Sequence, residues 1–393
     1  MENFEFSLPT KVYFGRGYEE KSGAIIKSYG YSSALVVIGQ GSVKKSGLLD
    51  KVTASLKEAG VEFFVLEGVQ PNPLLGKVKD GIELVRNKDI KFILAVGGGS
   101  VIDTAKAIGI GALYDGPVWD FFGLDAKAKP KKSLAVGTIL TIAAAGSETS
   151  NSCVITNEDG MLKRSTSGDA LRPLFSVLNP ENAATLSPHQ VACGVSDMMA
   201  HIIERYFTNT KNVHLSDMMS EAVMRSVVFN GPEAVKNPSG YDAMAEIMWA
   251  ASIAHNGILG MGREEDWASH KIAHELSTVF GTAHGEALAV VLPAWMGYTV
   301  NHDVRRFARF ARQVFSIPYD YNDFLENALD GIASFRQFLK NLGLKTSLSE
   351  LGATENDIAA LAAATAKRPD TGTIGNFVAL DKNDILNILK LAL

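Results

Sequence analysis

The chain has 393 residues, of which 46% are hydrophobic and 21% charged, and its formal net charge is −5. This balance is typical of a folded globular protein and excludes a disordered chain. The net negative charge gives no electrostatic reason to expect nucleic acid or an anionic membrane as a partner. The length exceeds that of one ordinary hydrophobic core and predicts two domains.

The N-terminus and the cysteine content indicate the compartment. The first residues lack the basic segment and apolar stretch of a signal peptide, and no apolar run is long enough to span a bilayer. We therefore expect a cytoplasmic protein. Cys153 and Cys193 are too few for a disulfide framework, and we expect both to be buried as small hydrophobic residues.

Short apolar runs alternate with amphipathic stretches in the first half of the chain. Residues 33–38, 61–66 and 91–96 are predicted strands. Residues 47–59 and a second stretch after the turn at 71–73 are predicted helices. This order favours a parallel, twisted sheet covered by helices. We expect a Rossmann-like α/β domain over residues 1–185.

The second half, from about Pro188, has long amphipathic segments in place of strands. Turn residues at 178–182 mark the junction. We expect an all-helical domain over residues 186–393. Its predicted helices cover 191–208, 214–229, 241–259, 268–280, 323–342 and 356–367.

A glycine-rich turn, Gly97-Gly98-Gly99-Ser100, joins the third predicted strand to a helix. Such a turn can bind phosphate, because backbone N–H groups approach the anion and the helix dipole favours negative charge. A tight turn that binds nothing would look the same, and the pattern differs from the usual G-x-G-x-x-G fingerprint. Asp103, in the first helical turn, either favours the helix dipole or accepts a hydrogen bond from a cofactor.

A second turn follows the first strand, where an acidic residue would normally bind the ribose of NAD. Gly39 stands there instead, so nothing repels a 2′-phosphate. Gly41 and Ser42 offer N–H groups and a hydroxyl to such a phosphate. Lys44 and Lys45 add positive charge, unless they only form a solvated helix start. We predict that NADPH is used and is preferred over NADH.

Residues 137–148 combine a strand with small residues and hydroxyls, and they end in Gly146-Ser147-Glu148. A wall of this composition can lie flat against a nicotinamide ring. This stretch alone, without the other motifs, does not indicate a cofactor site.

Two motifs in the second half contain histidines at helical spacing. Asp197 and His201 lie four residues apart, as do His270 and His274, and His284 follows. One such pair is usually a surface hydrogen bond. The segment around Asp197 is apolar, however, and buried polar groups need partners. A divalent cation, Zn²⁺ or Fe²⁺, would satisfy a carboxylate and three imidazoles together. The remaining histidines are expected to be ordinary: His189, His214, His255 and His302.

These motifs resemble the iron-containing (group III) alcohol dehydrogenases, in particular the butanol dehydrogenase and broad-range aldehyde reductase branch. The resemblance runs nearly end to end. It implies a dehydroquinate synthase-like fold, a cofactor cleft between the domains and a homodimer. It also implies an NAD(P)-linked enzyme that acts on short-chain primary alcohols and aldehydes, such as butanol and butanal. The matching segments are residues 14–17, 71–73, 97–106 and 146–148, both histidine motifs and 266–268.

The resemblance also implies roles for individual residues. The metal ligands fall on Asp197, His201, His270 and His284, and the pyrophosphate turn on residues 97–100. His274 falls close to the nicotinamide and substrate, where it would relay a proton or only pack. The family's threonine-rich stretch lacks two hydroxyls in this chain, at 141–147. The other positions that line the cofactor cleft are Asn72, Asp103, Thr138, Thr141, Ser147 and Lys163.

Two alternatives share parts of this pattern. A glycerol dehydrogenase-like or dehydroquinate synthase-like enzyme has the same fold but a different ligand set. A non-catalytic nucleotide- or metal-binding protein could also use the fold.

Overall fold

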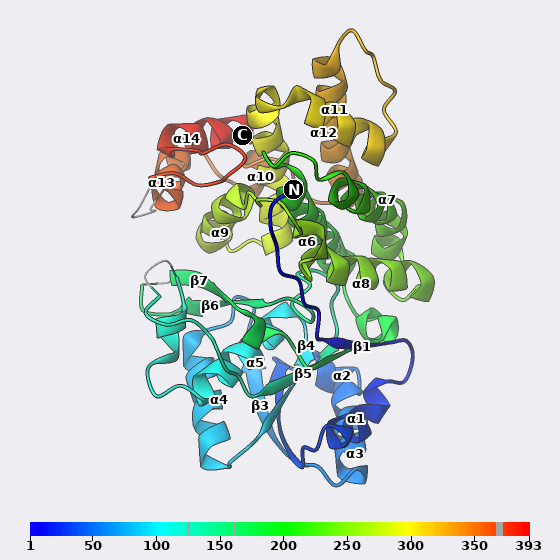
Figure 1. The fold of residues 1–393 in the computed structure, drawn as a ribbon, viewed down its shortest axis with the longest axis vertical. Helices are drawn as coiled ribbons and strands as arrows, with labels where there is room; N and C mark the ends of the chain where they lie inside the picture. Colours follow the sequence, from blue (N-terminus) through cyan, green and yellow to red (C-terminus); the bar gives the residue numbers. More distant parts are fainter. Residues whose placement is uncertain (124–125, 161, 367–371) are drawn as a thin grey trace. The chain divides into compact units, whose positions relative to one another are not determined.

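The computed structural model describes residues 1–123, 126–160, 162–366 and 372–393. The chain forms two compact units, Ser7–Leu186 and Ser187–Leu393 with Met1–Phe6 (Figure 1). The α/β domain is predicted to begin at residue 1, but the structure groups the first six residues with the helical unit. There the backbone N–H of Glu2 donates to the carbonyl of Gly262 at 2.9 Å. None of the helices in the described ranges is long and apolar enough to cross a bilayer.

The first unit is built on a six-stranded sheet of order β1-β8-β5-β4-β2-β3, in which all neighbouring strands are parallel. The predicted parallel sheet and its three strands are confirmed. An antiparallel hairpin, β6 (Ser152–Asn157) with β7 (Leu162–Ser167), was not anticipated. The strands of the sheet are β1 (Lys11–Phe14), β2 (Ser33–Gly39), β3 (Glu62–Val69), β4 (Phe92–Gly97), β5 (Ala135–Leu140) and β8 (Phe175–Leu178).

Helices cover both faces of this sheet, because its central strands are apolar on both sides. Alternate residues of a strand point to opposite faces. Val36 of β2 belongs to a core cluster with Val52 of α3, whereas its neighbour Leu35 is equally buried and faces the opposite layer. Both cysteines are buried, as expected. The helices of the unit are α1 (Ser22–Ser28), α2 (Ser42–Lys45), α3 (Leu48–Glu58), α4 (Leu75–Asn87) and α5 (Gly99–Ala112).

The second unit is helical, as predicted. Helix α9 coincides with the predicted segment 268–280, whereas α8 ends at His255, before the predicted end at 259. Helix α10 was not predicted, because it is buried along most of its length and has no polar face. Helices α11 and α14 were also not anticipated. The helices are α6 (Pro188–Tyr206), α7 (His214–Lys236), α8 (Tyr241–His255), α9 (Ala268–Phe280), α10 (His284–Thr299), α11 (Val304–Phe315), α12 (Phe324–Asn341), α13 (Glu355–Thr365) and α14 (Lys382–Leu391).

Candidate active site

Helix α6 presents two of the predicted metal ligands. Asp197 and His201 lie four residues apart, so their side chains project from the same face, and both are buried. The helix begins with a capping box, in which Ser187 and Gln190 bond each other's backbone N–H groups. Because Pro188 also favours the first turn, local sequence determines where α6 begins.

His270 and His284 come from the next two helices along the chain after α8. His270 is the third residue of α9, and His284 is the first residue of α10. Gly285 allows α10 to approach α6, because a Cβ atom there would lie 2.0 Å from the carbonyl oxygen of Cys193. Cys193 lies one helical turn before Asp197, so this close approach brings His284 beside the carboxylate.

Three imidazoles converge on one carboxylate oxygen of Asp197. Oδ1 of Asp197 lies 3.7 Å from Nδ1 of His201 and 3.8 Å from Nε2 of His270. The same oxygen lies 3.8 Å from Nε2 of His284. Ligand atoms about 2.1 Å from a tetrahedral zinc ion stand roughly 3.4 Å apart. The observed spacing is close to that requirement and too long for direct hydrogen bonds.

Three atoms of this cluster are buried and, within the described part of the chain, have no hydrogen-bond partner. They are Oδ1 of Asp197, Nδ1 of His201 and Nε2 of His270. Ligand atoms of these three residues lie within 4.8 Å of one another. A buried polar atom left unsatisfied costs about 1–3 kcal/mol. One divalent cation would satisfy all three, and a carboxylate with imidazoles suits Zn²⁺ or Fe²⁺.

The two buried imidazoles of α6 and α9 differ in their electrostatic surroundings. Burial lowers the pKa of His201 well below its ordinary value, and the neighbouring His255 and His270 lower it further. Burial also opposes a charge on His270, but the carboxylates of Glu204 and Asp197 outweigh it and raise the pKa of His270 to about 9.

Glu204 is a site residue that the sequence analysis missed. It is fully buried, and its Oε1 accepts the backbone N–H of His270 at 2.9 Å. Its Oε2 lies 2.9 Å from Nδ1 of the same imidazole. A signal was available, because Glu204 follows His201 by three residues on the same helix and is an acid in an apolar segment. His255, treated as ordinary above, also packs here, with its ring centroid 4.2 Å from that of His201.

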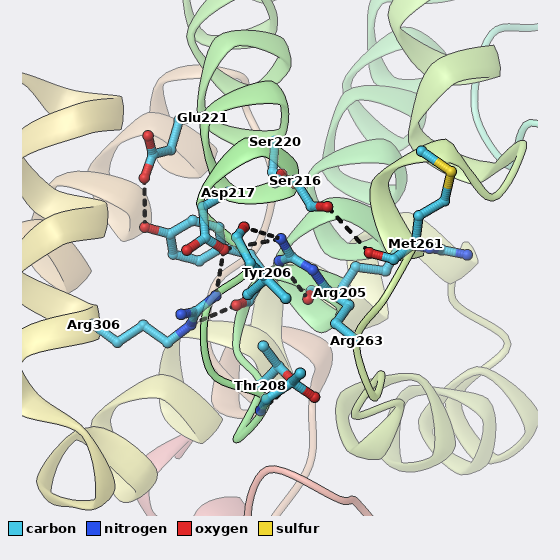
Figure 2. A network of polar contacts seen from close by, with 12 residues as sticks. Arg205, Tyr206, Thr208, Ser216, Asp217, Ser220, Glu221, Met261, Arg263 and Arg306 are labelled. Atoms are coloured by element: carbon cyan, nitrogen blue, oxygen red, sulfur yellow. Dashed lines mark hydrogen bonds and ion pairs between the residues drawn. The ribbon is translucent and has the colours of Figure 1, made fainter. Parts of the chain in front are cut away.

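The C-terminal end of α6 is anchored by a network of arginines and carboxylates (Figure 2). The last carbonyl groups of a helix have no partner within it. Arg263 donates to the carbonyl of Arg205 at 3.0 Å, and Arg306 donates to that of Tyr206 at 2.6 Å. Both arginines also pair with buried Asp217, at 3.0 and 2.7 Å. The arginine charges interact favourably with the helix dipole and hold the end of the helix that carries Asp197 and His201.

His274 lies beside the cluster and is half-buried. Its ring centroid is 5.1 Å from that of His284 and 6.5 Å from that of His270. It lies one turn after His270 on α9. The structure therefore brings all five predicted residues of the helical unit into one neighbourhood.

In the α/β unit, the predicted phosphate turn lies between β4 and α5. Gly97 ends β4, Gly98 precedes α5, and Gly99 and Ser100 begin the helix. The turn is tightly packed, because a Cβ atom at Gly98 would lie 2.2 Å from Cγ2 of Ile142. No side chain caps α5, so its first backbone N–H groups remain available for an anion.

Several predicted cofactor residues bond to one another. Oδ1 of Asp103 accepts the hydroxyl of Ser147 at 2.6 Å, and Oδ2 accepts the backbone N–H of Val154 at 2.9 Å. Burial raises the pKa of Asp103. Thr138 is fully buried in β5 and donates to Ser176 at 2.8 Å. These hydrogen bonds hold the protein framework around β5 and α5, and direct contacts of the three residues with a cofactor stay a prediction.

The remaining predicted residues lie at the carboxyl ends of strands or near the hairpin. Gly39 ends β2 and Thr141 follows β5, so both share an edge of the sheet with Gly97. The backbone N–H of Thr141 donates to the carbonyl of Gly97 at 3.2 Å. Asn72 accepts a hydrogen bond from Lys163 at 2.9 Å.

The turn after β2 contains Gly41 and Ser42, for which phosphate binding is predicted. Gly41 has φ of 130°, a conformation that favours glycine, and Ser42 begins the short helix α2. Lys44 forms an ion pair with Glu67 of β3. A carboxylate therefore stands beside one of the lysines proposed to attract a phosphate.

Fold and site together define a class of protein that combines an α/β unit, with a glycine-rich turn suited to an anion, and a helical unit suited to a divalent metal. Comparison with known families identifies it. Residues 9–180 match the family described as iron-containing alcohol dehydrogenase, and residues 190–393 match the C-terminal region of the Fe-containing alcohol dehydrogenase family. The chain belongs to this family.

Individual relatives match most or all of the chain. It is 41% identical over 393 residues to a probable NADH-dependent butanol dehydrogenase 2 of Bacillus subtilis, covering 100% of both chains. It is 35% identical to the NADPH-dependent aldehyde reductase YqhD of Escherichia coli, covering 92% of each. The crystal structure of an NADH-dependent butanol dehydrogenase A from Thermotoga maritima is similar, with a TM-score of 0.95 and 38% identity over 100% of this chain and 99% of that one.

Proposed function

We propose that this chain catalyses reversible hydride transfer between NAD(P) and short-chain primary alcohols or their aldehydes, with a divalent metal at Asp197, His201, His270 and His284. Membership of the family makes it an NAD(P)-linked alcohol dehydrogenase or aldehyde reductase. The observation that supports the metal assignment is the convergence of buried, unsatisfied ligand atoms on one carboxylate oxygen. The glycerol dehydrogenase-like or dehydroquinate synthase-like alternative is not favoured, because the relatives are named as butanol dehydrogenases and an aldehyde reductase.

The chemistry of the proposed site follows from its donors. The four side chains would hold Zn²⁺ or Fe²⁺, and such a cation would supply Lewis acidity that lowers the pKa of a substrate alcohol. Asp197 supplies the negative charge that partly neutralises such a cation. His274 stands beside the cluster, close enough to His284 to position the substrate or relay a proton.

The cofactor is proposed to lie across the carboxyl ends of β2, β4 and β5, where open α/β sheets bind their ligands. The amides of residues 97–100 at the start of α5 would hold its pyrophosphate. We propose that NADPH is preferred, because Gly39 brings no carboxylate to the ribose. Named relatives use either cofactor, so this preference is a proposal for this chain alone.

The test is a panel of aldehydes with NADH and NADPH, run on metal-stripped and metal-restored enzyme. We expect turnover only after Zn²⁺ or Fe²⁺ is restored. His270→Ala should abolish activity and lower the metal content, rather than only raise KM. Equal activity of stripped and restored enzyme would contradict the metal assignment.

A further inference from the structure

The start of α9 is held in an unusual way. Its first residues have backbone N–H groups with no partner inside the helix. The preceding residue, Trp267, has a left-handed backbone with φ of 65° and provides no side-chain cap. Such a conformation is strained for a residue other than glycine. The helix is therefore capped from elsewhere, and two buried carboxylates do so.

The two carboxylates accept different backbone N–H groups at the start of α9. Asp266 accepts the backbone N–H of Ala268, at 3.2 Å, with one oxygen, and with the other it accepts the backbone N–H groups of Asn376 and Phe377. Glu204 reaches from α6 and accepts the backbone N–H of His270 at 2.9 Å. Only Glu204 also contacts the imidazole, 2.9 Å from Nδ1.

The contact with the ring determines which imidazole nitrogen carries the proton. A carboxylate oxygen can only accept, so Nδ1 must donate its hydrogen to Glu204. In the neutral ring, Nε2 then keeps its lone pair, and this is the atom 3.8 Å from Oδ1 of Asp197. The other oxygen of Glu204 accepts the backbone N–H of His270, so Glu204 restrains both the backbone and the ring of this histidine.

We propose that Glu204 is a positioning residue for the metal: it fixes the tautomer and ring orientation of His270 so that Nε2 is presented as a ligand. This inference rests on the metal site of the proposed function. A carboxylate that orients a ligand imidazole typically changes metal affinity by about 10–100-fold. A carboxylate that merely capped α9 would affect folding but not the metal.

Glu204→Gln separates these roles. The amide oxygen can still accept the backbone N–H of His270, which preserves the cap. Its NH₂ group would then face Nδ1, which must become an acceptor, and the ring proton moves to Nε2. With the amide reversed, its NH₂ would face the backbone N–H, a pairing of two donors. Either orientation disfavours the ligand form of the ring.

The matched control is Asp266→Asn, which also replaces a buried carboxylate at the start of α9 with its amide but does not touch the ring. Co²⁺ affinity is measured by competition with a chromophoric chelator, together with the cobalt absorption spectrum and the Tm of the metal-free protein. We expect the Kd for Co²⁺ to rise 10–100-fold in Glu204→Gln and to stay within about threefold in Asp266→Asn. The cobalt spectrum should change only in Glu204→Gln.

An unchanged Kd in Glu204→Gln would overturn the proposal, as would an equal loss in both variants, because the latter reflects charge alone. Failure of the wild-type protein to bind Co²⁺, Zn²⁺ or Fe²⁺ would instead contradict the proposed function. If Glu204→Gln does not fold, ¹⁵N-histidine NMR of the ¹¹³Cd-loaded wild-type protein decides, with the His270 signal assigned by its loss in His270→Gln. We expect a protonated Nδ1 and cadmium coupling to Nε2, and cadmium on Nδ1 would refute the proposal.

Discussion

Two neighbouring glycines of the proposed pyrophosphate turn should respond oppositely to the same substitution. A Cβ atom at Gly98 would lie 2.2 Å from Cγ2 of Ile142, which is a severe overlap. A Cβ atom at Gly99 would meet nothing closer than Cβ of Ala145, at 3.6 Å, which is ordinary contact. Gly98→Ala therefore tests packing, whereas Gly99→Ala tests the space that the cofactor is proposed to use.

The expected magnitudes follow from these distances. Overpacking of this kind destabilises a protein by about 1–3 kcal/mol, so Gly98→Ala should lower the free energy of unfolding by that amount. Gly99→Ala should leave it unchanged or raise it by up to about 1 kcal/mol, because alanine is the better helix former. The same methyl group would stand against the pyrophosphate, so the Kd for the cofactor should rise tenfold or more in Gly99→Ala, about 1.4 kcal/mol.

The assays are denaturant unfolding of the cofactor-free protein and nicotinamide fluorescence titration with NADPH and NADH. Ile142→Ala provides a second-site control, because the nearest remaining atom to a Cβ at Gly98 is then Cβ of Ile142, at 3.7 Å. The destabilisation by Gly98→Ala should largely vanish in that background. Equal effects of the two glycine substitutions on stability would refute the packing argument. Unchanged cofactor affinity in Gly99→Ala would show that the pyrophosphate binds elsewhere.

Three further substitutions test other parts of the site. Gly39→Asp can be accommodated, since a Cβ there lies 3.5 Å from the nearest atom. The variant should reduce kcat/KM with NADPH at least tenfold while keeping NADH activity. Equal loss of activity with both cofactors would mean that glycine is needed for its backbone conformation alone. His274→Ala should lower kcat at full metal content, and unchanged kcat would leave His274 a packing role. Burial and the charge of Glu204 raise the pKa of Asp266 from 3.8 to about 6. Because the pKa of Asp266 is higher in the folded than in the unfolded state, the free energy of unfolding falls as pH rises from about 4 to about 6, by roughly 3 kcal/mol at most. Asp266→Asn should flatten unfolding free energy over this window relative to wild type, and parallel pH curves for the two proteins would contradict the assignment.

The parts of the fold that could be predicted have a regular hydrophobic pattern. Strands β2 and β4 are apolar at nearly every position because both of their faces are buried. The hairpin was missed because β7 is mostly exposed and polar. Helix α10 was missed for the opposite reason, since a helix buried all round has no amphipathic period to detect.

The site shows the same division between local and long-range information. The pairing of Asp197 with His201 follows from helical spacing alone. The approach of His284 depends on the packing of Gly285 against Cys193, which no local pattern specifies. The contacts of Arg263 and Arg306 with the end of α6 join residues 58 and 100 positions apart, so sequence spacing could not predict them.

The two parts of the proposed site are built on different physical principles. The framework around the proposed cofactor turn is internally satisfied, because Asp103, Ser147 and Thr138 already bond to protein groups. This side is therefore organised before any ligand binds, and the uncapped amides of α5 are what it offers to an anion. The histidine cluster instead leaves buried atoms of Asp197 and His270 unsatisfied. Their desolvation costs free energy in the metal-free fold, so part of the free energy of binding a metal at the proposed site would come from relieving it. We therefore expect the carboxylates and arginines that bond the end of α6 and the start of α9 to keep the proposed ligands together in the metal-free protein.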